Sequence, residues 1–203
     1  MTPAILLVCA YLLGGIPFGY LLVKFTTGRD VREFGSGNIG ATNVLRTTGR
    51  GIGIATLLLD IAKGAAAVWL AGRFTGGSVL WMSAAALAVM AGHAFPVFLK
   101  FRGGKAVASF IGAFLVLSPV PLLCVAVLFV IIVAATRYIS LGSIVAAGVF
   151  PLVVWLIQRP AWPLIAASII AGAFIIWRHR ANISRLRAGS EHRFSFGGSK
   201  PKS

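Results

Sequence analysis

Acidic residues are scarce in this chain, with four Asp and Glu against 19 Lys and Arg in 203 residues. Charged residues of both signs amount to only 11%, whereas apolar residues amount to 58%. So little charge cannot cover the surface of a soluble globule of this length. A water-soluble fold is therefore excluded. The formal charge of +15 is then better explained by membrane topology than by binding to nucleic acid.

Groups that could hold a metal are equally few. The two cysteines, Cys9 and Cys124, lie in separate apolar runs without disulfide or metal-ligand spacing, and we expect them to be packing residues. The three histidines and four carboxylates also lack the spacing of a ligand set. We therefore predict no metal and no organic cofactor. Because no carboxylate lies in the core of the motifs described below, the sequence also argues against a carboxylate base.

Long apolar runs make up most of the chain. A membrane-spanning helix takes about 20 apolar residues, and six runs of roughly that length or more occur, at 4–23, 51–72, 79–98, 106–136, 139–157 and 161–177. The 106–136 run is long for one crossing, and Ser118-Pro119-Val120-Pro121 interrupts it. Because proline inside a helix costs about 3 kcal/mol or more, we expect two short helices there. This division gives seven spans.

The basic residues are concentrated between these runs. Of the 19 Lys and Arg, 15 fall in three stretches at 24–50, 98–105 and 178–203. Since Lys and Arg gather in cytoplasmic loops, an even number of spans must separate each stretch from the next. Seven spans satisfy this requirement, and an undivided 106–136 run does not. The first basic residue, Lys24, follows the first run, which places the N-terminus outside.

We therefore predict an all-α fold, a polytopic membrane helical bundle of seven spans with the N-terminus outside and the C-terminus cytoplasmic. Some of its helices are expected to be short or broken. Residues 1–194 would form a single membrane-embedded domain and residues 195–203 a mobile polar tail. The alternative is one long tilted helix with a re-entrant segment elsewhere.

The first basic stretch contains a glycine-rich segment suited to an anion. Glycines recur from Gly35 to Gly40, and the Ala-Thr-Asn-Val-Leu-Arg that follows favours a helix whose N-terminus would point at that anion. Side chains add donors, and the guanidinium of Arg46 matches phosphate. The alternative is a flexible loop. The candidate site residues are Ser36, Gly37, Asn38, Gly40, Thr42, Asn43 and Arg46.

The second stretch joins the end of one helix to the start of the next. Pro96 is expected to end the third run. Gly103, Gly104 and Lys105 precede the fourth run, so bare backbone amides and an ammonium would meet at a helix N-terminus, where a phosphate would fit. His93 is either a substrate contact or a satisfied buried histidine.

The third stretch is expected to continue the last helix into the cytoplasm. His179 and Asn182 would share one face of it and could orient a polyol and its phosphate. The alternative is a basic helix lying on anionic lipid headgroups. Within the second run, Asp60 and Lys63 are three residues apart, and we expect them to pair, since an unpaired charge at mid-membrane costs about 2.5 to 3.5 kcal/mol.

Three strings in these stretches resemble the motifs of the bacterial acyl-phosphate:glycerol-3-phosphate acyltransferases. The strings are Ser-Gly-Asn-Ile-Gly-Ala-Thr-Asn-Val-Leu-Arg, Gly-His-Ala-Phe-Pro-Val-Phe-Leu-Lys-Phe-Arg-Gly-Gly-Lys and Arg-His-Arg-Ala-Asn-Ile-Ser-Arg-Leu-Arg-Ala-Gly-Ser-Glu. The resemblance covers essentially the whole chain, including Leu-Asp-Ile-Ala-Lys-Gly at 59–64. One departure is Ala106, where the family commonly has a further glycine.

The resemblance implies a bacterial inner-membrane enzyme with its active site facing the cytoplasm. It implies transfer of a fatty acyl group from acyl phosphate to the 1-position of glycerol 3-phosphate, giving lysophosphatidic acid and inorganic phosphate. Membrane lipids would be the other partners. We expect catalytic roles for Ser36, Arg46, Lys105 and His179, and substrate-binding roles for Gly37, Asn38, Gly40, Thr42, Asn43, His93, Gly103, Gly104 and Asn182.

An acyl phosphate is already activated, so the enzyme needs mainly to hold the sugar hydroxyl near the carbonyl carbon, stabilise the oxyanion and support the departing phosphate. Two bases are possible, neutral His179 and a phosphate oxygen of a substrate, and we favour the phosphate. Two hypotheses of other classes stand beside the enzyme, a transporter or channel for a phosphorylated anion and a non-catalytic binder of anionic lipids.

Overall fold

The computed structural model describes residues 2–194, so the predicted tail at 195–203 lies outside the described part of the chain. Within 2–194 the chain is entirely helical, as predicted. Its elements in chain order are α1 Pro3–Gly15, α2 Phe18–Thr27, η1 Val31–Glu33, α3 Ala41–Thr47, α4 Arg50–Phe74, α5 Val79–Ala94, η2 Val97–Leu99, α6 Val107–Leu117, α7 Pro119–Thr136, α8 Ile139–Gln158, α9 Trp162–Arg178 and α10 Arg180–Arg187.

Several helices are long and apolar enough to cross a bilayer. Within residues 2–194, five spans qualify by length and composition: Pro3–Thr27, Arg50–Phe74, Val79–Leu99, Pro119–Thr136 and Ile139–Gln158. A sixth qualifies if α9 and α10, which meet at a bend of 55°, count as one broken span. The apolar helix α6 is shorter, with 11 residues. The protein is therefore an integral, multi-pass membrane protein.

Two breaks in the helices come from proline. The predicted division of the fourth run is confirmed, because α6 ends at Leu117 and α7 begins at Pro119. A second break was not predicted. Ile16-Pro17 divides the apolar run at 4–23 into α1 and α2. The carbonyl of Ile16, freed by this break, accepts a hydrogen bond of 2.8 Å from Lys63 Nζ.

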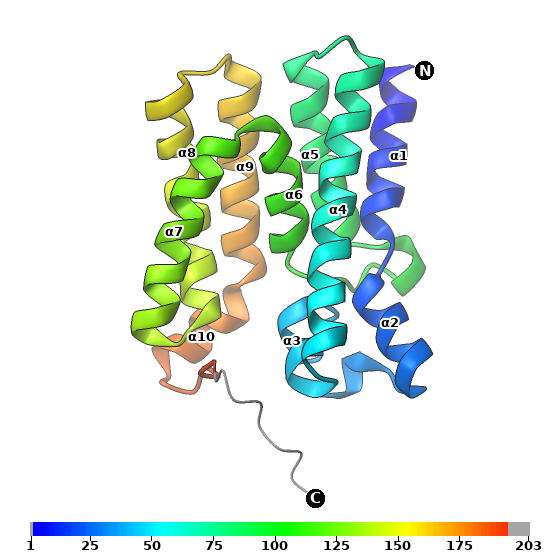
Figure 1. Cartoon of the computed structure of the whole chain (residues 1–203), viewed down its shortest axis with the longest axis vertical. Coiled ribbons are helices and arrows are strands. Elements are labelled where there is room, and N and C mark those ends of the chain that lie inside the picture. The colour runs from blue at the N-terminus through cyan, green and yellow to red at the C-terminus, as the bar shows by residue number, and fades with distance from the viewer. Residues whose placement is uncertain (1, 195–203) are drawn as a thin grey trace, which may run out of the picture.

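The helices form one bundle in which α6 occupies a central position (Figure 1). This helix packs mainly on α4 and also contacts α5, α7 and α9. The ring centroids of Phe110 and Phe114 of α6 lie 4.9 and 4.8 Å from that of Phe150 of α8 and 4.7 Å from each other. Because neighbours surround it, an 11-residue helix can be stable in the membrane although it is too short to cross alone.

Polar segments gather at one end of the bundle. In Figure 1, α2, α3 and α10 lie at this end, whereas the α4–α5 and α8–α9 connections lie at the opposite end. The first and third basic stretches lie near each other in space, since the charges of Arg185 and Glu191 act on Arg46.

Two predictions about this fold were wrong. The third stretch does not continue the last helix straight, because α9 ends at Arg178 and the chain turns by 55° into α10. Cys9 and Cys124 are exposed on the apolar outer surface of α1 and α7, and so they are not core packing residues.

Candidate active site

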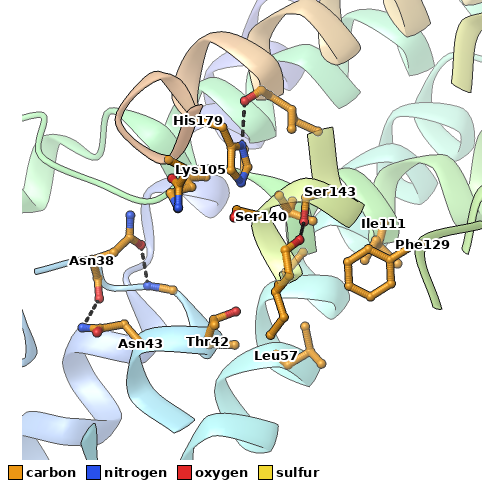
Figure 2. Close-up of a pocket in the computed structure, with 18 of the residues that line it drawn as sticks. Asn38, Thr42, Asn43, Leu57, Lys105, Ile111, Phe129, Ser140, Ser143 and His179 are labelled. Carbon is orange, nitrogen blue, oxygen red and sulfur yellow. Dashed lines mark hydrogen bonds between the residues drawn. The ribbon is translucent and has the colours of Figure 1, made fainter. Parts of the chain in front are cut away.

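A cavity of about 400 Å³ lies between α3, α4, α6, α7, α8 and the α9–α10 bend. All three basic stretches contribute to its wall. Ten of the 13 predicted site residues line it: Ser36, Asn38, Gly40, Thr42, Asn43, Arg46, His93, Lys105, His179 and Asn182. In Figure 2, Lys105, His179 and Asn38 lie on one side of the cavity, and Leu57, Ile111 and Phe129 lie on the other.

The glycine-rich segment is organised from inside by Asn43. The side chain of Asn43 is 2% exposed, and its Oδ1 accepts the N–H of Ser36 at 2.8 Å. Its Nδ2 donates to the carbonyls of Val31, Phe34 and Asn38 at 3.3, 3.1 and 2.9 Å. The amide of Asn43 is thus committed to the loop, and its geometry favours holding Ser36 and Asn38 at the cavity over binding substrate directly.

The remaining predicted residues of the first stretch surround this loop. Gly37 does not line the cavity, and its φ of 68° serves a turn that its N–H closes on Phe34. Arg46 follows on the short helix α3, whose first residue comes directly after Gly40. Burial lowers the pKa of the Arg46 guanidinium, and Arg185 nearby lowers it further while Glu191 raises it. Arginine keeps its proton in proteins, so Arg46 contributes a fixed positive charge.

The backbone amides of Gly103 and Gly104 are not bare, contrary to the prediction. Their N–H groups do not point at a bound anion, because they donate to the carbonyls of Ala94 and His93 at 3.1 Å each. Their carbonyls accept from Arg178, at 3.0 Å for Gly103 and at 3.1 and 2.8 Å for Gly104. Neither glycine lines the cavity. The turn is a packed support, and Lys105, which follows it, is the group that reaches the cavity.

Lys105 is a partly buried ammonium among other cations. Burial lowers its pKa to about 8, with Glu191 opposing this effect and Arg185, Arg178 and Arg46 adding to it. An anion that binds beside this lysine stabilises its charged form, because the opposite charge offsets the cost of burial. This electrostatic setting fits a phosphate.

His179 lies at the bend between α9 and α10 and is 3% exposed. Its Nδ1 is 2.8 Å from the carbonyl of Ile175, the bond drawn at the ring in Figure 2. Burial, followed by the charge of Lys105, lowers the pKa of His179 to about 4, so the imidazole is neutral near pH 7. A neutral ring with this bond carries its proton on Nδ1, which leaves Nε2 as an acceptor.

Glu191 is a site residue that was missed from the sequence. Its Oε1 accepts from Asn182 Nδ2 at 2.7 Å and from Ser140 Oγ at 2.9 Å, and its Oε2 accepts from Arg185 Nε at 2.7 Å. Burial alone would raise the pKa of Glu191, but the hydrogen bonds from Asn182, Arg185 and Ser140 lower it overall.

Three further cavity residues were not among the predicted site residues. Asp60 lines the cavity, as Glu191 does, although the sequence suggested only an ion pair with Lys63 for it. Ser140 and Ser143 also line it, at the start of α8. The sequence offered two signals for these residues. Glu191 is a single acidic residue in a strongly basic stretch, and Ser140 and Ser143 are two hydroxyls three residues apart at the polar end of an apolar run.

The cavity has an apolar side that reaches the bundle surface. Ile54 and Leu57 of α4 line it and are also 51% and 37% exposed. The other apolar residues of this side are Ile111, Leu122, Val125, Ala126 and Phe129. A hydrocarbon chain could therefore extend from the cationic end of the cavity towards the bilayer.

No group of three His, Cys, Asp or Glu residues within 2–194 is arranged to hold a metal ion. Asp60 and Lys63 form the predicted ion pair, with Nζ of Lys63 2.8 Å from Oδ1 of Asp60. The side chains that line the cavity supply cations, a neutral imidazole, hydroxyls, amides and the two carboxylates of Asp60 and Glu191.

Comparison with known proteins gives a consistent result. Residues 4–189 match the family described as glycerol-3-phosphate acyltransferase. The chain is 49% identical over 194 residues to the glycerol-3-phosphate acyltransferase of Geobacter sulfurreducens, covering 96% of this chain and 98% of that protein. It is 50% identical over 186 residues to that of Trichlorobacter lovleyi, covering 91% and 94%.

Two solved structures are also similar. One is PlsY (YgiH), an integral membrane glycerol 3-phosphate acyltransferase, in its glycerol 3-phosphate form, with a TM-score of 0.90 and 38% identity over 95% of this chain and 96% of that one. The other is the lysophosphatidic acid form of PlsY, with a TM-score of 0.86 and 36% identity over 95% of each chain.

Proposed function

This chain belongs to the integral-membrane glycerol-3-phosphate acyltransferase family, and we propose that the cavity described above is where it transfers an acyl group from acyl phosphate to the 1-position of glycerol 3-phosphate. The protein is an acyltransferase of phospholipid synthesis, with glycerol 3-phosphate as substrate and lysophosphatidic acid as product. This family membership sets aside the transporter and lipid-binder hypotheses.

One observation carries the assignment to this cavity. A cationic end, with Arg46 and Lys105, is continuous with an apolar side that reaches the bundle surface near Leu57. Acyl phosphate has the same two parts, a phosphate and a hydrocarbon chain. Glycerol 3-phosphate adds a second phosphate, which explains why more than one cation lines the cavity.

The polar residues divide the remaining tasks. Arg46 and Lys105 would hold the two phosphates, and Ser36 would donate to a phosphate or carbonyl oxygen. Asn182 is held by Glu191 through its Nδ2, whereas its buried Oδ1 has no hydrogen-bond partner within residues 2–194. This Oδ1 would accept a hydroxyl of the glycerol. Asn38, Gly40 and Thr42 complete the wall beside Ser36.

The reaction then needs one bond to form and one to break. The 1-hydroxyl oxygen attacks the carbonyl carbon, and the bond from that carbon to the phosphate oxygen breaks, releasing inorganic phosphate. The hydroxyl proton passes to a phosphate oxygen of a substrate, whose second pKa is near 6. His179, neutral and with Nε2 free to accept, orients the hydroxyl. The second possibility is that Nε2 takes the proton itself.

We also propose seven spans with this cavity facing the cytoplasm. The spans would be α1 with α2, followed by α4, α5, α6, α7, α8 and α9, and residues 1–194 would be one domain of the bacterial cell membrane. Two features support this topology, the clustering of polar segments at the end of the bundle near α2, α3 and α10 (Figure 1) and the confirmed break at Ser118.

Cysteine accessibility tests the topology. In a background with Cys9 and Cys124 replaced by Ala, a cysteine at position 120, beside the break and 54% exposed, should react with an impermeant reagent only from the outside. Ser78→Cys, in the α4–α5 connection, is the outside control, and Ser190→Cys is the cytoplasmic control. Labelling of position 120 only from the cytoplasm would rule out the seven-span arrangement.

A donor comparison tests the reaction. Purified protein in detergent is given labelled glycerol 3-phosphate with either acyl phosphate or an acyl thioester of the same chain. We expect lysophosphatidic acid and inorganic phosphate in equal amounts from acyl phosphate and no product from the thioester. Product from the thioester alone would refute acyl phosphate as the donor.

A further inference from the structure

His93 lies between the cavity and the Gly103–Lys105 turn, and the reaction above gives it no chemical task. His93 is 4% exposed, and its Nδ1 is 3.6 Å from Oδ1 of Asp60, which is 2% exposed. Lys63 already balances the charge of Asp60 at 2.8 Å. His93 is therefore not needed to neutralise this carboxylate.

The other edge of the His93 ring packs against the turn that precedes Lys105. A Cβ placed on Gly104 would overlap Nε2 of His93 and would lie 2.9 Å from its Cδ2. The carbonyl of His93 also accepts the N–H of Gly104 at 3.1 Å. Arg178 donates to the carbonyls of Gly103 and Gly104. The turn is therefore clamped between His93 and Arg178.

We propose that His93, oriented by Asp60, is a positioning residue that sets the place of the Lys105 ammonium by packing on Gly104. The carboxylate of Asp60 lies 3.6 Å from Nδ1, and this contact at one edge of the ring leaves Nε2 at the other edge against Gly104. Because Lys105 follows Gly104 directly, a shift of the turn displaces its ammonium. The proposal rests on the phosphate-binding role of Lys105 given above.

A steric suppression experiment tests the packing. Gly104→Ala should lower kcat/KM about 100-fold, because its methyl group collides with the His93 ring and moves the turn by roughly 1 Å. His93→Ala alone should lower kcat/KM about tenfold, since the turn loses one support. In His93→Ala/Gly104→Ala the new methyl group occupies space that the ring has left. We expect this double variant to match His93→Ala alone.

Gly103 offers a matched control. A Cβ there would meet the backbone carbonyl of His93 and the ring of Pro96, neither of which His93→Ala removes. His93→Ala/Gly103→Ala should therefore be no more active than Gly103→Ala. If Gly104→Ala does not fold, recovery of folded protein in the Gly104 double variant alone is the equivalent result. The proposal is overturned if the losses of Gly104→Ala and His93→Ala, in kcat/KM or in yield of folded protein, simply multiply in His93→Ala/Gly104→Ala.

A second cycle asks whether His93 acts through Lys105. In a Lys105→Ala background, His93→Ala should lower kcat/KM by less than about threefold, because the group that it positions is gone. A persisting tenfold loss would mean that His93 acts by another route. If Lys105→Ala alone retains wild-type kinetics, the phosphate-binding role of Lys105 fails, and successful suppression at Gly104 would then report packing only.

Discussion

The pH dependence of the wild-type enzyme should expose the unusual lysine in its cavity. The charged form of Lys105 is lost as the pH rises through its lowered pKa of about 8. An ordinary lysine, with a pKa near 10.4, would remain almost fully charged at pH 9, whereas about nine-tenths of Lys105 would be neutral there. If the neutral form does not bind phosphate, kcat/KM falls about tenfold per pH unit above pH 8.

Initial rates between pH 7 and 10, at subsaturating concentrations of each substrate in turn, measure this fall. Both substrate phosphates, with second pKa values near 6, are already about nine-tenths ionised at pH 7, so a fall in rate above pH 8 reports a group on the enzyme. Non-enzymatic hydrolysis of acyl phosphate is subtracted at each pH. Lys105→Arg is the matched control, because arginine keeps its charge up to pH 10 and should flatten the alkaline limb. A flat wild-type profile to pH 10 would refute the argument.

Substitutions elsewhere in the cavity separate loop order, charge pairing and proton transfer. Asn43→Asp keeps the acceptor for the Ser36 N–H but loses the Nδ2 group, whose two protons are shared among three carbonyls and are worth about 1 kcal/mol each. Tm and kcat/KM should therefore both fall, and an unchanged Tm would contradict this. Glu191→Ala leaves three donors without their acceptor, at about 1 to 3 kcal/mol each, and should lower Tm more than Glu191→Gln does. His179→Ala should retain kcat within about tenfold at saturating substrate if a phosphate is the base, whereas a loss of about 1,000-fold or more would assign proton transfer to His179.

Helices and their proline breaks were partly predictable from the sequence. The long run at 106–136 carried two prolines and a parity conflict, so its division before Pro119 could be predicted. The run at 4–23 offered no such conflict, and its break at Pro17 was missed. The bend at His179 was also missed, because α9 and α10 are adjacent in sequence and nothing local shows that the chain turns between them.

Site residues could be predicted where the local sequence determines their chemistry. They could not be predicted where their hydrogen-bond partners come from distant parts of the chain. Gly103 and Gly104 looked like bare amides because their acceptors, the carbonyls of Ala94 and His93, lie nine and eleven residues earlier in the chain. Glu191 was set aside because the sequence does not show that Ser140, 51 residues earlier, donates to it. In both cases tertiary contacts decided whether a polar group faces the cavity.

The central claim is that all three basic stretches wall one cavity in which acyl phosphate and glycerol 3-phosphate react. Its most direct test measures kcat/KM for both substrates in Arg46→Ala, Lys105→Ala and Asn182→Ala, one variant from each stretch. Lys24→Ala, Lys100→Ala and Arg187→Ala are the controls from the same stretches, at residues outside the cavity. We predict losses of at least about 100-fold in each cavity variant and less than about threefold in each control. Wild-type kinetics in any cavity variant would contradict the claim for its stretch.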